Sequence, residues 1–232
     1  MPENADGTRR VPATFAMLDF LEQLAERLAA SLPGEAVRAR FAPQPCPWAI
    51  KTSLSDKPRQ AAVLILLYMH EGHWHLPLTL RPSHMAEHAG QVSLPGGAVE
   101  PGETEAEAAV REFHEELGDD GQTIRMLGSL SPIHVRTSNY WVTPCVATTA
   151  QRPAFAPNPT EVERLIEVRL CHLLDADQFG SHPRRHHGQP YTAPHFLVES
   201  HRVWGATCLI LGELVTLLEE FRAEEGFRIE NL

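Results

Sequence analysis

The stretch QVSLPGGAVEPGETEAEAAVREFHEELG, residues 91–118, carries the strongest local signal in the sequence. Positions 100–120 hold nine acidic side chains and one basic side chain, Arg111, which gives a local charge of −8. The whole chain has a net charge of −10, so most of its excess negative charge is confined to this segment. A function for the segment must therefore explain why so many carboxylates are placed together.

Residues 103–117 have the periodicity of an amphipathic helix that Gly118 ends. At about 100° per residue, an apolar stripe forms on one side, and Glu112, Glu115 and Glu116 form a second stripe. A charged, solvated outer face is the simpler interpretation of this pattern. However, like charges one turn apart repel each other unless a cation neutralises them. Clustered carboxylates suit Mg²⁺, Mn²⁺ or Ca²⁺ rather than zinc, and the charge pattern alone leaves both interpretations open.

The turn before this helix, Pro95-Gly96-Gly97, allows the backbone to approach a ligand closely, because glycine has no side chain. A carbonyl oxygen of the turn could add a neutral ligand to a metal shell. Arg111 lies within the acidic cluster and can donate in a fork to Glu103 or to a neighbouring carboxylate, which would hold that group in place. The turn and the helix together favour a metal site over a solvated surface.

These residues resemble the Nudix box, whose pattern is G-x5-E-x7-R-E-U-x-E-E-x-G-U, where U is a bulky apolar residue. Only the last position departs, because Asp119 stands where an apolar residue is usual. The resemblance implies an α/β fold, an α/β/α sandwich around a mixed β-sheet with the box as a loop–helix–loop catalytic motif. It also implies hydrolysis of a nucleoside diphosphate linked to another moiety, with Mg²⁺ or Mn²⁺ as cofactor. The matching residues are Gly97, Glu103, Arg111, Glu112, Phe113, Glu115, Glu116 and Gly118.

Carried over by position, the resemblance implies that Glu112 and Glu116 are the main metal ligands and that Glu103 and Arg111 orient them. The family often takes a catalytic base from a loop after the box, and Glu161 is the candidate here, with Glu163 as the alternative. A solvated acid at the start of a strand is the simpler interpretation of both. The predicted catalytic residues are Glu103, Arg111, Glu115, Glu116 and Glu161, and the predicted metal ligands are Glu112, Glu115, Glu116 and the Gly96 carbonyl.

The residues just before the box resemble the coenzyme A (CoA) diphosphatase branch, whose signature is L-L-T-x-R-[SA]-x3-R-x3-G-x3-F-P-G-G. Arg81 and Gly90 match it and are the predicted substrate-binding positions. Ala86 stands where the second arginine belongs, and alanine cannot replace a guanidinium. The branch implies cleavage of CoA to 4′-phosphopantetheine and adenosine 3′,5′-bisphosphate. Another diphosphate (ADP-ribose, a dinucleotide or a nucleoside triphosphate) is the alternative substrate, and a non-catalytic nucleotide-binding module is a third interpretation.

Composition sets the broad class of protein. The chain has 232 residues, of which 43% are hydrophobic, enough for one domain with extensions. Its four cysteines show no paired spacing, which argues against a zinc site or disulfide framework and favours a cytoplasmic location.

No signal peptide is visible, and the longest apolar run, residues 61–69, is too short for a bilayer, so no membrane association is expected. A pI near 5.7 gives no reason to expect nucleic-acid binding. The family is often dimeric, so a homodimer is an expectation of the resemblance.

Along the chain we expect a disordered segment over 1–14, a helix with a Pro-rich extension over 15–58, the Nudix hydrolase domain over 59–224 and a tail over 225–232. The polar stretch 181–190 is predicted to be a loop, and its segment 182–187 suits either a mobile phosphate-contacting loop or, more simply, an exposed hairpin tip. Trp204 is predicted to be a core residue at a helix start. Strands are predicted over 61–69 and 74–80 (a hairpin), 124–130, 141–149, 164–170 and 191–203, and a closing helix over 204–224.

Overall fold

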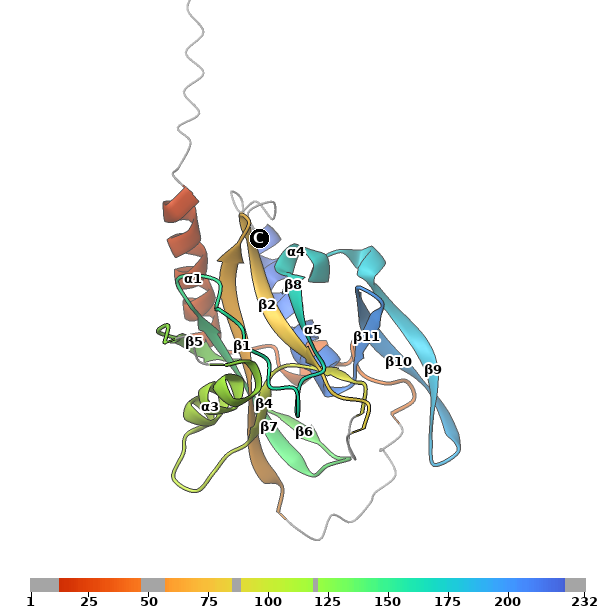
Figure 1. Cartoon of the computed structure of the whole chain (residues 1–232). Helices are drawn as coiled ribbons and strands as arrows, with labels where there is room; N and C mark the ends of the chain where they lie inside the picture. The colour runs from red at the N-terminus through yellow and green to blue at the C-terminus, as the bar shows by residue number, and fades with distance from the viewer. Residues whose placement is uncertain (1–12, 47–56, 85–88, 119–120, 224–232) are drawn as a thin grey trace, which may run out of the picture.

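The computed structural model of the chain describes residues 13–46, 57–84, 89–118 and 121–223 (Figure 1). Its helices are α1 (Ala13–Ala29), α2 (Glu35–Arg38), α3 (Glu105–Leu117), α4 (Leu170–Leu173) and α5 (Ala206–Ala223), with a 3₁₀ turn η1 (Ala176–Gln178). The strands of the large sheet are β1 (Arg59–His70), β2 (His73–Leu80), β3 (Val92–Ser93), β4 (Gly96–Ala98), β5 (Arg125–Ser129), β6 (Ile133–Val135), β7 (Tyr140–Thr148) and β8 (Arg164–Arg169). A smaller sheet contains β9 (Phe179–His186), β10 (Gln189–Val198) and β11 (His201–Trp204).

The central strand β1 is apolar on both faces because helices cover both faces of the sheet. Its side chains alternate between two cores: Leu64 and Leu66 pack in one cluster with Phe113 of α3, whereas Ile65 and Leu67 pack in the other with residues of α1 and α5. In Figure 1, α5 lies behind the sheet that α3 covers from the other side. The predicted α/β/α sandwich is therefore confirmed.

The sheet is mixed, and its pairing fixes the turn that carries Gly96 and Gly97. β1 runs parallel to β7, and it pairs antiparallel with β2 in the predicted hairpin. The short strand β4 pairs antiparallel with the first half of β1, so that Gly97 lies opposite Ala62 and Gly96 opposite Val63. The glycine turn is thus held against β1, the central strand of the sheet.

The second sheet corrects two predictions. The stretch 181–190 is not a loop, because β9 pairs with β10 along its length and only His187 and Gly188 form the turn between them. The predicted strand 191–203 is two strands, β10 and β11, separated by a turn at Glu199 and Ser200. β9 is an edge strand, and an edge tolerates prolines and charges that a central strand does not.

A buried charge fastens the N-terminal extension to α5. Glu213 of α5 is fully buried, and its Oε2 accepts a hydrogen bond from Arg38 at 2.8 Å. Its Oε1 accepts from the Ser131 hydroxyl at 2.6 Å and from the Gly34 N–H at 3.1 Å. Because α5 forms a wall of the cavity described below, this network also fixes that wall.

Some predictions concern residues outside the described part of the chain. Ala86 and Asp119 are two of these, and so are the tail 225–232 and most of the segment 1–14. The helix α1 begins at Ala13, inside that segment. Among the described residues, no helix is both long and apolar enough to span a membrane.

Candidate active site

The acidic helix α3 begins at Glu105, two residues later than predicted, because Thr104 caps it. The Thr104 hydroxyl accepts a hydrogen bond from the Glu107 N–H at 3.3 Å, and the Glu107 carboxylate accepts one from the Thr104 N–H at 2.8 Å. Gly118 ends the helix with a φ of 89°. Phe113 and Leu117 are buried on the sheet side, which sets the rotation of the helix and the direction of its glutamates.

Arg111 is the centre of a charge network. Its Nε donates to Glu103 Oε1 at 2.7 Å and its Nη2 to Glu103 Oε2 at 3.1 Å, which is a two-point fork. Nη2 also donates to the Ala98 carbonyl at 3.0 Å. Nη1 donates to Glu112 Oε1 at 3.0 Å and to Glu115 Oε1 at 3.3 Å. The hydrogen bonds from Arg111 lower the pKa of Glu103 below its ordinary value. One guanidinium thus connects the loop, β4 and the helix carboxylates.

Glu116 is the buried member of the acidic cluster, with only 4% of its surface exposed. Its Oε1 accepts a hydrogen bond from the Gly96 N–H at 3.3 Å. Burial raises the pKa of Glu116 to about 7, although the Gly96 N–H and the charge of Arg81 oppose this shift. A buried carboxylate with so high a pKa is a typical feature of functional sites.

The carboxylate of Glu112 lies directly against the backbone of Gly97. A Cβ atom at position 97 would lie 2.4 Å from the Glu112 carboxyl carbon and 2.4 Å from one of its oxygens. Burial raises the pKa of Glu112, while hydrogen bonding from Arg111 opposes the shift. The space for this carboxylate exists only because position 97 has no side chain.

Glu115 is the exposed member of the acidic cluster and shares Arg111 Nη1 with Glu112. Its side chain is 52% exposed and contacts Arg111. Within the part of the chain that the structure describes, no three His, Cys, Asp or Glu side chains are arranged to hold a metal ion. The donor chemistry nevertheless fits a hard cation, because Glu112 and Glu116 lie one turn apart, the charge of Glu112 raises the pKa of Glu116, and the Glu112 carboxylate lies in the space that Gly97 leaves open.

Of the two candidate bases, the structure brings Glu161 to the acidic cluster. Its charge raises the pKa of both Glu112 and Glu116. Its loop is tied to the end of α3, because the Asn158 N–H donates to the Glu116 carbonyl at 2.8 Å. Glu163 is exposed, and it accepts a hydrogen bond from the Ser83 N–H at 3.2 Å.

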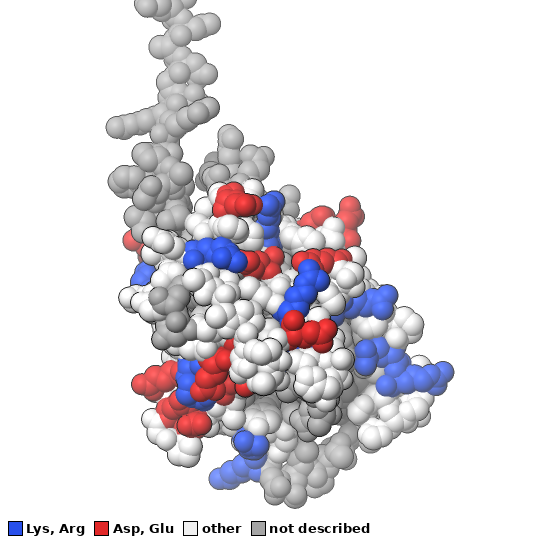
Figure 2. All heavy atoms as spheres, viewed as in Figure 1, with Lys and Arg blue, Asp and Glu red and all other residues white. Residues whose placement is uncertain are grey.

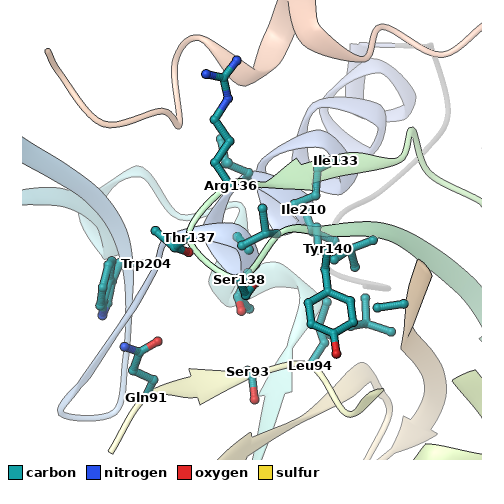
Figure 3. A pocket seen from close by; sticks show the side chains of 18 of the residues that line it. Gln91, Ser93, Leu94, Ile133, Arg136, Thr137, Ser138, Tyr140, Trp204 and Ile210 are labelled. Carbon is teal, nitrogen blue, oxygen red and sulfur yellow. The ribbon is translucent and has the colours of Figure 1, made fainter. Parts of the chain in front are cut away.

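A cavity of about 570 Å³ is lined by the Gly96–Gly97 turn and so adjoins the acidic cluster. Figure 3 shows side chains that line this cavity. Its walls come from β3 and β4, from the turn between β6 and β7, from the junction of β11 with α5, and from β9. Arg81 lines it, and the buried Nε of Arg81 has no hydrogen-bond partner among the described residues. The predicted Gly90 donates its N–H to the Arg81 carbonyl at 3.1 Å, so it fixes the backbone of Arg81. Of the two predicted substrate-binding residues, Arg81 thus lines the cavity and Gly90 holds the backbone of Arg81.

Several residues that line the cavity carry no sequence motif, and Trp204 has a different place from the predicted one. Arg136 and Tyr140, on either side of the β6–β7 turn, line the cavity, although no local motif marks them. Trp204 is not a core residue at a helix start, because it ends β11 and lines the cavity. The following Gly205, with a φ of 69°, separates the strand from α5 and was the one sequence signal that the helix begins later.

Comparison with known proteins places the chain in a family. It matches the NUDIX domain over residues 58–196. The "Mitochondrial coenzyme A diphosphatase NUDT8" of Mus musculus is 35% identical over 170 residues, which cover 71% of this chain and 80% of the relative. The "Uncharacterized Nudix hydrolase NudL" of Photorhabdus laumondii is 33% identical over 162 residues, covering 69% and 86%. A solved MutT protein from Methanosarcina mazei is 19% identical and covers 72% of this chain and 99% of its own, with a TM-score of 0.46. On the domain match and the two relatives, the chain belongs to the Nudix family of hydrolases, which act on pyrophosphate bonds.

Proposed function

We propose that the protein is a divalent-metal-dependent CoA diphosphatase that cleaves CoA or its derivatives to 4′-phosphopantetheine and adenosine 3′,5′-bisphosphate. The observation that carries the proposal is the Gly96–Gly97 turn, where the carboxylates of α3 meet a cavity that Arg81 lines. The 35% identity to a mouse CoA diphosphatase supports the choice of substrate.

Glu112 and Glu116 would hold Mg²⁺ or Mn²⁺, with the Gly96 carbonyl and Glu115 as further ligands. All four are hard oxygen donors, which these cations prefer. When bound, the cation supplies positive charge that offsets the diphosphate and polarises its phosphoryl group. Glu115 would have to exchange its contact with Arg111, which is made at 3.3 Å by a half-exposed side chain and is therefore weak.

Arg111 and Glu103 would act as positioning residues. Their two-point fork and the bond from Arg111 to the Ala98 carbonyl fix the guanidinium, which in turn holds Glu112. A carboxylate that is fixed in advance loses less side-chain entropy when it binds a cation. The fork therefore serves the site without contacting the substrate.

Glu161 would act as the base. In the proposed reaction, water attacks one phosphorus of the diphosphate, the bond from that phosphorus to the bridging oxygen breaks, and the water proton passes to Glu161. The position of Glu161 beside Glu112 and Glu116 supports this role. Glu163 is the weaker alternative, because it is exposed and its charge is not among the causes that shift the pKa of Glu112 or Glu116.

Another diphosphate is the second candidate substrate, because Ala86 departs from the CoA signature. We propose to test CoA, ADP-ribose, a dinucleotide and a nucleoside triphosphate as substrates. The assay measures the release of the phosphate-containing products with Mg²⁺ or Mn²⁺ present. We expect CoA to have the highest kcat/KM of the four. A higher value for another compound would move the assignment within the family, and no turnover of any compound would leave only a binding role. The cytoplasmic location and the homodimer stay predictions.

A further inference from the structure

The cavity extends well beyond the acidic cluster, and its far wall belongs to the second sheet. Trp204 of β11 and Arg184 of β9 both line it. In Figure 3, Trp204 lies at one side of the cavity and Tyr140 at the other, with Gln91 next to Trp204. A substrate whose diphosphate lies at the Gly96–Gly97 turn therefore has room to place another part of itself against this wall.

Arg184 is positioned by an aromatic ring and lacks a counter-charge. Its guanidinium carbon lies 3.8 Å from the centre of the Trp204 ring, a close cation–π contact. Its Nε is buried without a hydrogen-bond partner, and it forms no salt bridge within the described residues. A buried donor without a partner is costly, so such a group needs a water, an ion or a ligand to accept its hydrogen bond. The stacking fixes the guanidinium plane, and Arg184 lines the cavity, so an anion bound in the cavity can accept hydrogen bonds from it.

The surroundings of Arg184 are electropositive. Burial lowers the pKa of His182, and the neighbouring His195, Arg202 and Arg184 lower it further. Figure 2 shows basic side chains at the edge where the β9–β10 hairpin lies, opposite the acidic side chains over α3. By contrast, Arg81 acts electrostatically on Glu116 and so belongs to the acidic end of the cavity. Two cationic groups thus serve two parts of one cavity.

We propose that Arg184, held on Trp204, binds a phosphate monoester of the substrate that is distinct from the diphosphate under attack. This inference rests on the proposed function and sharpens it, because CoA carries a 3′-phosphate that dephospho-CoA and ADP-ribose lack. A guanidinium edge matches the oxygens of a phosphate monoester in a two-point contact. Arg184 is then the residue that makes the enzyme prefer CoA over other nucleoside diphosphates.

The test compares kcat/KM for CoA and for dephospho-CoA in the full-length protein and in Arg184→Gln. The wild type should prefer CoA, and the variant should lose about 10- to 100-fold of that preference, the value of a charge-assisted hydrogen bond. Arg184→Lys keeps the charge without the fork and should retain part of the preference. The matched control is Arg40→Gln, because Arg40 stacks on Phe41 and Phe179 at 5.2 and 5.6 Å and does not line the cavity. Equal loss for both substrates, or an unchanged ratio, would overturn the inference.

A binding measurement separates this inference from the proposed function. Calorimetry without metal would compare adenosine 3′,5′-bisphosphate with adenosine 5′-monophosphate, using the same variants. The bisphosphate should bind more tightly to the wild type, and Arg184→Gln should remove the difference. If the wild type hydrolyses neither coenzyme, the proposed function is wrong, and the binding preference still decides the inference. Equal affinity for both nucleotides in the wild type would refute it.

Discussion

Replacing Gly97 by alanine should remove most of the activity and leave the fold intact. The backbone at Gly97 lies outside the left-handed region, so an alanine can adopt its conformation. The three heavy atoms nearest to the new methyl group would all belong to the carboxylate of Glu112. The substitution therefore tests the position of a single proposed metal ligand.

The size of the effect follows from the geometry. The Glu112 carboxyl carbon would have to move from 2.4 Å to about 3.4 Å from the new Cβ, a retreat of about 1 Å. A misplacement of about 1 Å in an active site can cost about 10²-fold in rate. The free energy of unfolding should change little, because the displaced atoms lie at the end of a flexible side chain. Alanine also restricts the unfolded chain, which stabilises the protein by about 0.4–1 kcal/mol and offsets part of the cost.

The neighbouring glycine provides the contrast. A Cβ at Gly96 would lie 2.3 Å from the Ala62 carbonyl oxygen and 2.6 Å from the Val63 Cα, and the φ of Gly96 is 154°. Neither backbone atom can move without disturbing the β1–β4 pairing, so Gly96→Ala should destabilise the protein by about 2–5 kcal/mol. Gly180→Ala is the neutral control, because its Cβ would meet His195 at an ordinary 3.4 Å.

The assay is kcat/KM with the preferred diphosphate at saturating Mg²⁺, together with thermal unfolding of each variant. We expect Gly97→Ala to lose about 10²-fold in kcat/KM with a melting temperature within a few degrees of the wild type. Full activity in this variant would show that the position of Glu112 does not matter, and the proposed ligand set would fall with it. A large drop in melting temperature would show instead that Gly97 supports the fold.

Three further predictions follow from single contacts. Glu116→Gln should lose at least about 10²-fold in kcat while remaining folded, since a buried neutral amide replaces a charged ligand; near-normal kcat would reject the metal assignment. Glu213→Gln should cost about 3 kcal/mol in denaturant unfolding, because it removes a fully buried carboxylate that pairs with the largely buried Arg38. A loss below 1 kcal/mol would contradict the anchoring role. Burial alone would raise the pKa of Glu167, but hydrogen bonds from Arg152 and Tyr68 outweigh it and lower that pKa. Glu167 should therefore stabilise the fold above its ordinary pKa of 4.5 and lose this effect as the pH falls through the lower folded value. The stability gap between wild type and Glu167→Gln, about 1–2 kcal/mol at pH 7, should then narrow below pH 4.5, and a constant gap would refute the coupling.

The parts of the fold that could be predicted from sequence are those with a local cause. The apolar run of β1 can only be buried on both faces, and the period of α3 follows from its own side chains. The chemistry of Gly97, Glu103 and Arg111 could likewise be predicted from their spacing, because all three lie within one loop and helix. The N-terminal boundary of α3 was misplaced by two residues, since Thr104 caps the helix and satisfies its free backbone groups.

The second sheet could be predicted only in part: a strand over 191–203 was expected, but β9 was not, because its signals are not local. β9 carries prolines and charged residues and alternates between half-buried and exposed positions, so no continuous apolar run marks it. Its inner face becomes a cavity wall only when the chain brings β11 beside β3. Trp204 shows the same limit, because an aromatic residue before a helical pattern resembles a core residue until the cavity next to it is known.

This limit bears on the substrate. The signature for CoA places its second arginine at position 86, in the segment that leads to the glycine turn. A guanidinium can bind the same phosphate from another part of the chain if its edge reaches the anion. Arg184 reaches the cavity that Arg81 lines from a different sheet, a convergence that no spacing within the signature can reveal. If Arg184 binds the 3′-phosphate, Ala86 does not argue against CoA. The missing arginine is then replaced in function by one that is remote in sequence. If Arg184→Gln leaves the preference for CoA unchanged, this replacement fails, and Ala86 again favours another diphosphate.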